Sequence, residues 1–160
     1  NPKIKIFCDA DWGGDMDDRH SFTGVVVMIG HNVVQWISSK QKNISLSTME
    51  AEYVALASGV REAKWINMLL NELELYEYLS GSCDMYCDNR AAIDFSKSRI
   101  ENLRTKHIDI AHHIVREEVE KKSIKLSYVA SNENLADIMT KVLKRIAHKT
   151  CSLGLGLGIA

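Results

Sequence analysis

Residues Thr48–Leu73 read TMEAEYVALASGVREAKWINMLLNEL, and their spacing predicts one long amphipathic helix. At about 100° per residue, the side chains of Glu52, Leu56, Ala63 and Leu70 fall within about 40° of one another. No proline and no interior run of β-branched residues interrupts the segment. The apolar stripe therefore contains a carboxylate, Glu52, at a position where an unpaired buried charge is costly.

A second acid at the start of this helix has a structural explanation. Ser47 and Glu50 have the spacing of a capping box, in which Ser47 caps the first turn and Glu50 reaches back to the amide of Ser47. Glu50 also projects about 160° away from Glu52, so we expect it to face water. Glu52 has no such structural role and is the candidate functional residue of the helix.

Composition limits the classes of protein to consider. The chain has 160 residues, 46% of them hydrophobic, and a net charge of −1. We expect one globular domain at residues 1–150 and a loosely ordered C-terminal tail at 151–160. No apolar run is long enough to cross a membrane, so we expect no membrane partner. The four cysteines lack metal-binding spacing and are expected to be buried thiols. The first residues, Asn-Pro without methionine, suggest a piece of a longer polypeptide.

Alternating apolar residues and turn signals predict the other elements. We expect strands at residues 3–11, 21–30, 32–40, 84–88 and 124–129, and further helices at 90–96, 105–122 and 134–148. This order predicts an α/β fold with a five-stranded mixed sheet, three antiparallel strands followed by two parallel strands, flanked by helices. The long helix would form a right-handed crossover that brings the fourth strand beside the first.

The first and fourth strands both end in an aromatic residue, a cysteine and an aspartate, at Asp9 and Asp88. If these strands are parallel neighbours, both aspartates lie at the carboxyl edge of the sheet, where open α/β sheets bind ligands. Glu52 can face the same edge, and Asp137 is a fourth candidate. Taken singly, Asp9 and Asp88 could form turns, and Asp137 could complement a helix dipole.

Clustered together, these acids would repel one another and take up protons unless cations lay among them. A set of carboxylates without a histidine or cysteine set suits Mg²⁺ or Mn²⁺ rather than zinc. Two such ions can stabilise the attacking and the leaving oxygen of a displacement at phosphorus. The set therefore favours hydrolysis of a phosphodiester.

Several segments together resemble the ribonuclease H domain of copia-type LTR-retrotransposon reverse transcriptases. They follow in order along the chain: CDADWGGD at 8–15, SLSTMEAEYVAL at 45–56, YCDN at 86–89, RTKHIDI at 104–110 and NLADIMTK at 134–141. The likeness runs from about Ile4 to Lys141. One departure is Val142, where the family usually has proline, and the C-terminal tail is less typical.

The resemblance implies a ribonuclease H-like fold and an endoribonuclease that cleaves the RNA strand of RNA–DNA hybrids with two Mg²⁺ ions, for which Mn²⁺ can substitute. The family's four acids map onto Asp9, Glu52, Asp88 and Asp137. The family analogy also implies a catalytic role for His107, which could instead be a polar residue at a helix start. The implied partners are the hybrid and the polymerase domain of the same polyprotein, and the implied location is a cytoplasmic virus-like particle.

Four polar residues flank the predicted edge and are candidate substrate-binding residues: Ser45, Ser47, Asn89 and Arg90. They could contact phosphates and 2′-hydroxyls, although polar residues at helix starts also act as caps. Two tryptophans, Trp36 and Trp65, are expected to cover the core or the sheet. Two other functions stay open at this point. The chain could be a non-catalytic module that packs on a polymerase or binds nucleic acid, or a nuclease of the same fold that cuts DNA.

Overall fold

The computed structural model describes residues 1–75, 77, 82–98 and 109–158. Its centre is a five-stranded sheet in the order β3-β2-β1-β4-β5. The strands are β1 (Ile4–Asp11), β2 (Phe22–Ile29), β3 (Asn32–Lys40), β4 (Cys83–Cys87) and β5 (Ile124–Tyr128). The first three strands pair antiparallel, and β4 runs parallel to both β1 and β5. The mixed sheet predicted from the sequence is therefore confirmed.

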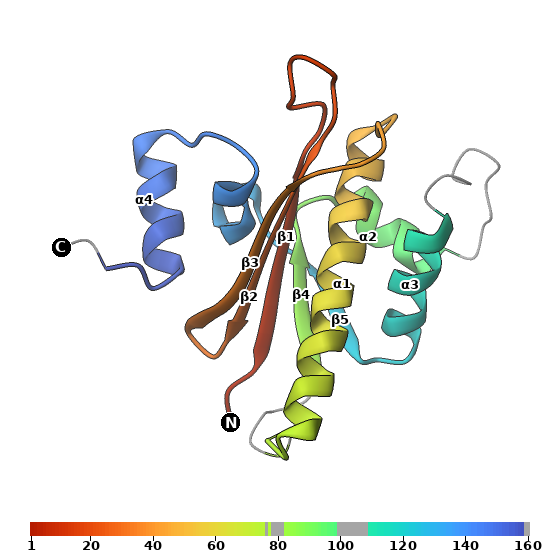
Figure 1. Cartoon of the computed structure of the whole chain (residues 1–160), viewed down its shortest axis with the longest axis vertical. Helices are drawn as coiled ribbons and strands as arrows, with labels where there is room; N and C mark the ends of the chain where they lie inside the picture. The colour runs from red at the N-terminus through yellow and green to blue at the C-terminus, as the bar shows by residue number, and fades with distance from the viewer. Residues whose placement is uncertain (76, 78–81, 99–108, 159–160) are drawn as a thin grey trace.

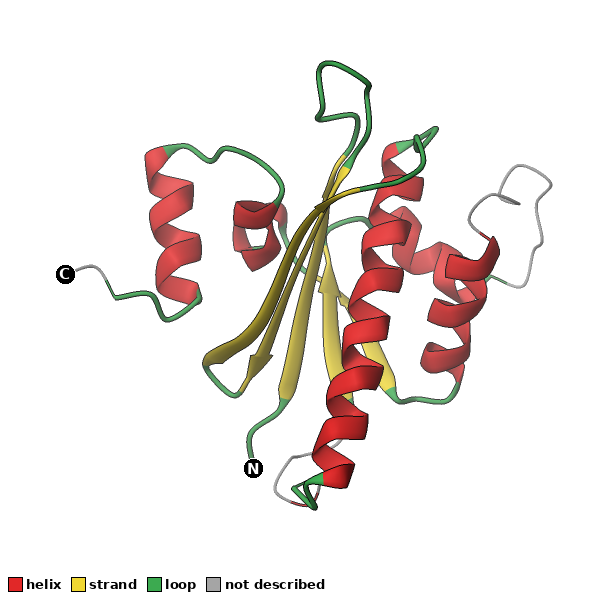
Figure 2. Ribbon diagram, in the orientation of Figure 1, coloured by secondary structure: helices red, strands yellow, loops and turns green. Residues whose placement is uncertain are grey.

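Helices cover one face of the sheet, as Figures 1 and 2 show. They are α1 (Thr48–Glu72), α2 (Arg90–Lys97) and α3 (Asp109–Glu120). The short 3₁₀ helices η3 (Ser131–Glu133) and η4 (Leu135–Met139) and the helix α4 (Arg145–Gly154) come last in the chain. In Figure 1, η4 and α4 lie across the sheet from α1. Residues 105–108, at the start of the predicted helix 105–122, lie outside the described residues.

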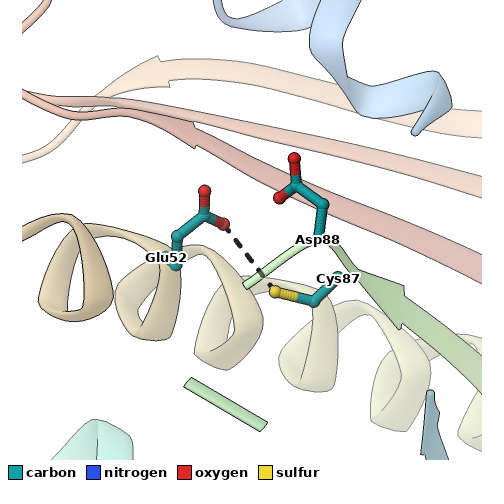
Figure 3. Close-up of side chains that lie close together, drawn as sticks. All are labelled: Glu52, Cys87 and Asp88. Carbon is teal, nitrogen blue, oxygen red and sulfur yellow. Dashed lines mark hydrogen bonds between the residues drawn. The ribbon is translucent and has the colours of Figure 1, made fainter. Parts of the chain in front are cut away.

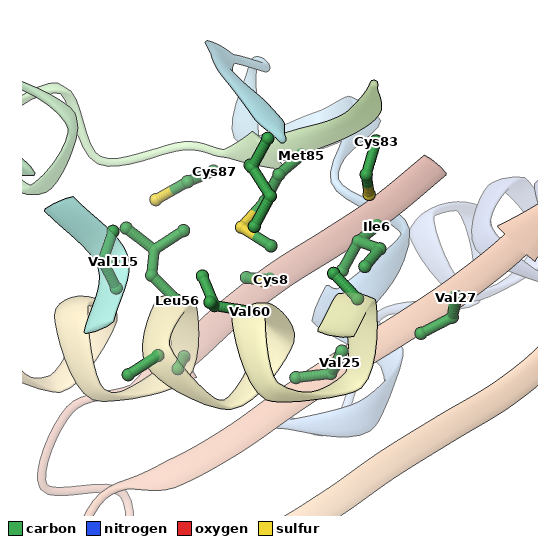
Figure 4. Close-up of a cluster of buried hydrophobic side chains, with 14 of the residues drawn as sticks. Ile6, Cys8, Val25, Val27, Leu56, Val60, Cys83, Met85, Cys87 and Val115 are labelled. Carbon is green, nitrogen blue, oxygen red and sulfur yellow. The ribbon is translucent and has the colours of Figure 1, made fainter. Parts of the chain in front are cut away.

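The main core lies between α1 and the sheet (Figure 4). Alternation along β1 places Ile6 and Cys8 in this core, whereas Phe7 packs in the smaller core on the other face. Gly59 lets α1 lie close to β1, because a Cβ atom at that position would be 2.5 Å from the Sγ of Cys8. The long helix thus packs closely on the strand that carries Asp9.

The N-terminus of α1 differs from the prediction in two details. Ser47 accepts a hydrogen bond from the amide of Glu50 at 3.2 Å, as a capping box requires. The carboxylate of Glu50 accepts instead from the amide of Leu46, at 2.7 Å. Glu50 is also only 6% exposed, so the expectation that it faces water is wrong. The side chain thus turns back to the loop that precedes the helix.

The predicted helix at 134–148 is also wrong. The structure has the short η4 there, an irregular segment, and then α4 from Arg145. Apolar residues of this segment do not share one buried face, since Ala136 is buried while Val142 and Ile146 are exposed. The helix α4 crosses the predicted domain boundary after residue 150, and Cys151 and Leu155 are buried. Residues up to 155 therefore pack on the fold instead of belonging to a tail.

Two further observations concern the surface. Trp36 is 64% exposed and Trp65 is 53% exposed, so neither belongs to the core, the first of the two places expected for them. Trp36 lies on β3 of the sheet and lines a pocket with Met139 and Leu155. Among the described residues, no helix combines the length and the apolar character needed to span a bilayer.

Candidate metal centre

The parallel pairing of β1 and β4 places two aspartates side by side. Cys8 pairs with Cys87 in the register of the two strands, and each cysteine is followed by an aspartate, Asp9 and Asp88. Both strands point their carboxyl ends toward the same edge of the sheet, as the sequence predicted. The N-terminal turns of α1 carry Glu52 to this edge.

Four acids from separate elements form two overlapping sets of possible metal ligands. One set contains Glu52, Cys87 and Asp88, and the other contains Asp9, Asp88 and Asp137. Within each set, one ligand atom from every residue lies within 4.8 Å of the others. Figure 3 shows the first set, with the carboxyl groups of Glu52 and Asp88 near the end of β4. The four acids that the sequence singled out therefore meet, and Asp88 belongs to both sets.

The cluster is largely shielded from water. Asp9 is 1% exposed, Glu52 is 4% exposed and Asp137 is 9% exposed. Burial, together with the negative charges of Asp9 and Asp88, raises the pKa of Glu52 to about 9. Burial and the charge of Asp9 raise the pKa of Asp137 to about 6, and burial also raises the pKa of Asp9. Without a cation these carboxyl groups tend to bind protons.

One lysine partly compensates the acids. The Nζ atom of Lys141 lies 3.2 Å from Oδ1 of Asp137 and 3.6 Å from Oδ2 of Asp9. Burial would lower the pKa of Lys141, but the charges of Asp9 and Asp137 outweigh it and raise that pKa. A single ammonium group cannot balance four carboxylates, so the centre retains an excess of negative charge.

Sequence reasoning missed three contributors to this centre. Cys87 was expected only as a buried thiol, yet its Sγ lies 3.8 Å from Oε2 of Glu52. Lys141 and Thr140 were not identified either, although the hydroxyl of Thr140 donates a hydrogen bond to Asp9. The aromatic-Cys-Asp pattern was a usable signal for Cys87. The other two contacts join residues about 130 positions apart and arise only from the packing of η4 on the sheet.

The candidate substrate-binding residues have structural contacts in this structure. Ser47 caps α1, and the side chain of Asn89 caps α2 by accepting from the amide of Ala92 at 3.0 Å. Ser45 is buried and donates to Gln41 at 3.0 Å. The guanidinium of Arg90 lies 3.9 Å from the centre of the Tyr128 ring. Contact of these four residues with substrate stays a prediction.

The remaining candidate, His107, lies outside the described residues.

A groove of about 410 Å³ runs beside the start of α1, and it carries several cationic and hydroxyl side chains. Its lining includes Ser39, Lys40, Lys42, Ser45, Ser58 and Arg61. Side chains of these types are suited to contact with a phosphate backbone.

Solved structures with a similar fold include ribonuclease H domains. The N-terminal RNase H domain of Rv2228c from Mycobacterium tuberculosis matches with a TM-score of 0.61, covering 98% of this chain and 98% of that one, at 13% identity. RNase H1 from Halobacterium salinarum matches with a TM-score of 0.62 over 86% of this chain and 94% of that one, also at 13% identity. The chain has the ribonuclease H-like fold.

Relatives by sequence are transposon polyproteins. A Pol polyprotein from transposon TNT 1-94 of Nicotiana tabacum is 40% identical over 98% of this chain. The Pol polyprotein from transposon RE2 of Arabidopsis thaliana is 37% identical over 96% of it. These homologues confirm the relationship to retrotransposon Pol that the motifs predicted. The chain spans only 12% and 10% of the two relatives' lengths. No protein-family model matches the chain.

Proposed function

We propose that this chain is a ribonuclease H, an endoribonuclease that hydrolyses the RNA strand of RNA–DNA hybrids. One observation carries the proposal: four acids from separate elements meet at the carboxyl edge of a ribonuclease H-like sheet. The homology to Pol polyproteins supports a role in reverse transcription, beside the polymerase domain of the same polyprotein.

The donor set suits divalent cations that prefer oxygen. The two overlapping sets supply four carboxylates and one thiol, and they share Asp88. Mg²⁺ and Mn²⁺ favour oxygen donors, and their charge would offset the burial and the mutual repulsion that raise the pKa of Glu52 and Asp137. We propose that Asp9, Glu52, Asp88 and Asp137 hold two ions.

Bound ions of this kind would activate a water molecule and stabilise the charge on the departing oxygen. The protein's own contribution is to fix the ligands and to limit access of water. Asp9 is held in β1 and Glu52 in α1, both rigid elements that share the main core. A site built on strands and helices in this way can keep its ligands in place without a loop rearrangement.

Recognition of the hybrid would depend mainly on shape and on the sugar-phosphate backbone. The groove beside α1 offers Lys42 and Arg61 to phosphates, and Ser45 lines the same groove. Two solved neighbours are described as complexes with an RNA/DNA hybrid, LC11-RNase H1 and the foamy viral protease-reverse transcriptase. With a net charge of −1, this chain should bind a hybrid weakly on its own.

Digestion of labelled duplexes tests the proposal. We expect the chain to cut RNA–DNA hybrid with Mg²⁺ or Mn²⁺, and to leave DNA–DNA and RNA–RNA duplexes intact. The variant Asp88→Asn should not cut, whereas Asp94→Asn, the same change at an exposed position of α2, should cut normally. Cutting of DNA–DNA would favour a DNA nuclease of this fold. No cutting of any duplex at low salt with Mn²⁺ would favour the non-catalytic binding module.

A further inference from the structure

Two residues that directly follow η4 contact the carboxylate of Asp9. The hydroxyl of Thr140 donates a hydrogen bond to Oδ2 of Asp9, and the ammonium of Lys141 lies 3.6 Å from the same oxygen. Both contacts involve one carboxylate oxygen, and Asp9 is only 1% exposed. Such contacts restrict rotation of the carboxyl group, which determines the direction in which it can offer an oxygen to a cation.

The same hydroxyl also ties Asp9 to the turn that carries Asp137. The Oγ1 atom of Thr140 lies 3.1 Å from the carbonyl oxygen of Asp137, and the amide of Thr140 donates to that carbonyl at 3.2 Å. These contacts place Thr140 between two candidate ligands. Because Thr140 is only 9% exposed, it also lies away from bulk water. Its position links the placement of Asp9 on β1 to the placement of Asp137 on η4.

A glycine on the neighbouring strand makes this close approach possible. Gly24 pairs directly with Asp9 in the register of β1 and β2. A Cβ atom on Gly24 would lie 2.7 Å from Cγ2 of Thr140, 2.8 Å from the carbonyl oxygen of Ala136 and 3.0 Å from Cβ of Met139. The missing side chain of Gly24 thus provides the space that η4 occupies.

We propose that Thr140 is a positioning residue, which orients the carboxylate of Asp9 for divalent-cation binding from the space that Gly24 leaves open. The inference rests on the proposed function, because it assigns Thr140 a role in the same metal centre. Hydrogen bonds to a metal-binding group fix its orientation, and their loss typically weakens metal affinity by about 10- to 100-fold.

Two substitutions at this position separate the hydroxyl from the methyl group. Thr140→Val keeps a methyl group against Gly24 and removes the hydroxyl with its contacts to Asp9 and to the carbonyl of Asp137. Thr140→Ser keeps the hydroxyl and removes the methyl group. Thr150→Val is the matched control, because the hydroxyl of Thr150 bonds within the exposed helix α4 at 3.1 Å from the carbonyl of Ile146.

Mn²⁺ affinity, measured by isothermal titration calorimetry without nucleic acid, is the readout. We expect the dissociation constant to rise about 10- to 100-fold in Thr140→Val and to stay within about threefold of wild type in Thr140→Ser and Thr150→Val. Gly24→Ala, which displaces the hydroxyl without removing it, should also weaken Mn²⁺ binding, and it serves as a second route should Thr140→Val not fold.

Wild-type affinity in a folded Thr140→Val would overturn the inference and leave the proposed function standing. Equal weakening in Thr140→Val and Thr140→Ser would also overturn it, because it would indicate packing instead of the hydrogen bond. A wild-type chain that binds no Mn²⁺ and cuts no hybrid would overturn both the inference and the proposed function.

Discussion

Replacement of Gly24 by alanine should destabilise the domain through a single steric conflict. Ordinary contacts of a Cβ atom lie at 3.4–4 Å, whereas the new atom would meet Cγ2 of Thr140 at 2.7 Å and the carbonyl oxygen of Ala136 at 2.8 Å. One obstacle is backbone, so the clash cannot be relieved by a rotamer change alone. The turn η4 must move away from β2 by several tenths of an ångström.

The magnitude follows from two opposing effects. Overpacking of a tight site costs about 1–3 kcal/mol. Alanine in place of glycine inside a strand recovers about 0.5–1 kcal/mol, because less conformational entropy is lost on folding. Two of the contacts fall below 3.0 Å and one of these is to backbone, so the cost should lie in the upper part of its range, about 2–3 kcal/mol. We therefore expect the free energy of unfolding to fall by about 1–2.5 kcal/mol. For a domain of this size that corresponds to a decrease in melting temperature of about 2–10 °C.

Urea unfolding followed by circular dichroism measures this change. Gly158→Ala is the matched control, since a Cβ atom there has no other atom within 4 Å. We expect the control to unfold at the wild-type midpoint and Gly24→Ala to unfold at a lower one with an unchanged slope. Equal stability of the two variants would refute the reasoning that η4 is docked in the space above Gly24.

Three further substitutions test other parts of the site. Asp88→Asn removes the ligand shared by both sets, so we expect thermal-shift measurements to show no stabilisation by Mg²⁺ while the far-ultraviolet circular dichroism is unchanged. Glu52→Gln removes a buried acid whose pKa rises on folding from 4.5 to about 9. The folded wild type then binds more protons than the unfolded chain, so its metal-free stability should decrease as pH rises through this range. Urea unfolding in EDTA should show a shallower decrease in Glu52→Gln, with a gain over wild type of up to about 3 kcal/mol at pH 7. Asp9 and Asp137, whose pKa values are also raised, keep the remaining part of the decrease. Asn134→Ala removes a buried amide that donates to the carbonyl of Cys8 at 2.9 Å and caps η4. Urea unfolding should show a loss of about 2–3 kcal/mol, because the carbonyl next to Asp9 is left without that partner.

Much of the fold could be predicted because local patterns agree with the tertiary arrangement. The capped, uninterrupted helix over Thr48–Glu72 and the alternation along β1 each reflect a face that packs on the main core. The convergence of Asp9 and Asp88 followed from two strands with the same ending and from the rule for parallel neighbours. Helical phase alone identifies Glu52, and not Glu50, as the candidate functional acid, and the structure brings Glu52 into the cluster.

The failures share a physical cause, because each depends on contacts between residues distant in the sequence. Glu50 is buried and accepts a hydrogen bond from Leu46 in the preceding loop, a contact that helical phase cannot indicate. The sequence predicts one long helix at 134–148, but the structure has a short 3₁₀ turn after Asn134, whose buried contacts reach β1 and β2. The role of Thr140 likewise depends on the space over Gly24, more than a hundred residues earlier.

Anomalous diffraction from crystals of the domain soaked in Mn²⁺ would locate the ions themselves. We expect metal density bound by Asp9, Asp88 and Asp137 and by Glu52 and Asp88, and the loss of this density in Asp88→Asn. Mn²⁺ bound only at other acidic residues, with these four carboxyl groups free of metal, would show that the four acids do not form a metal centre.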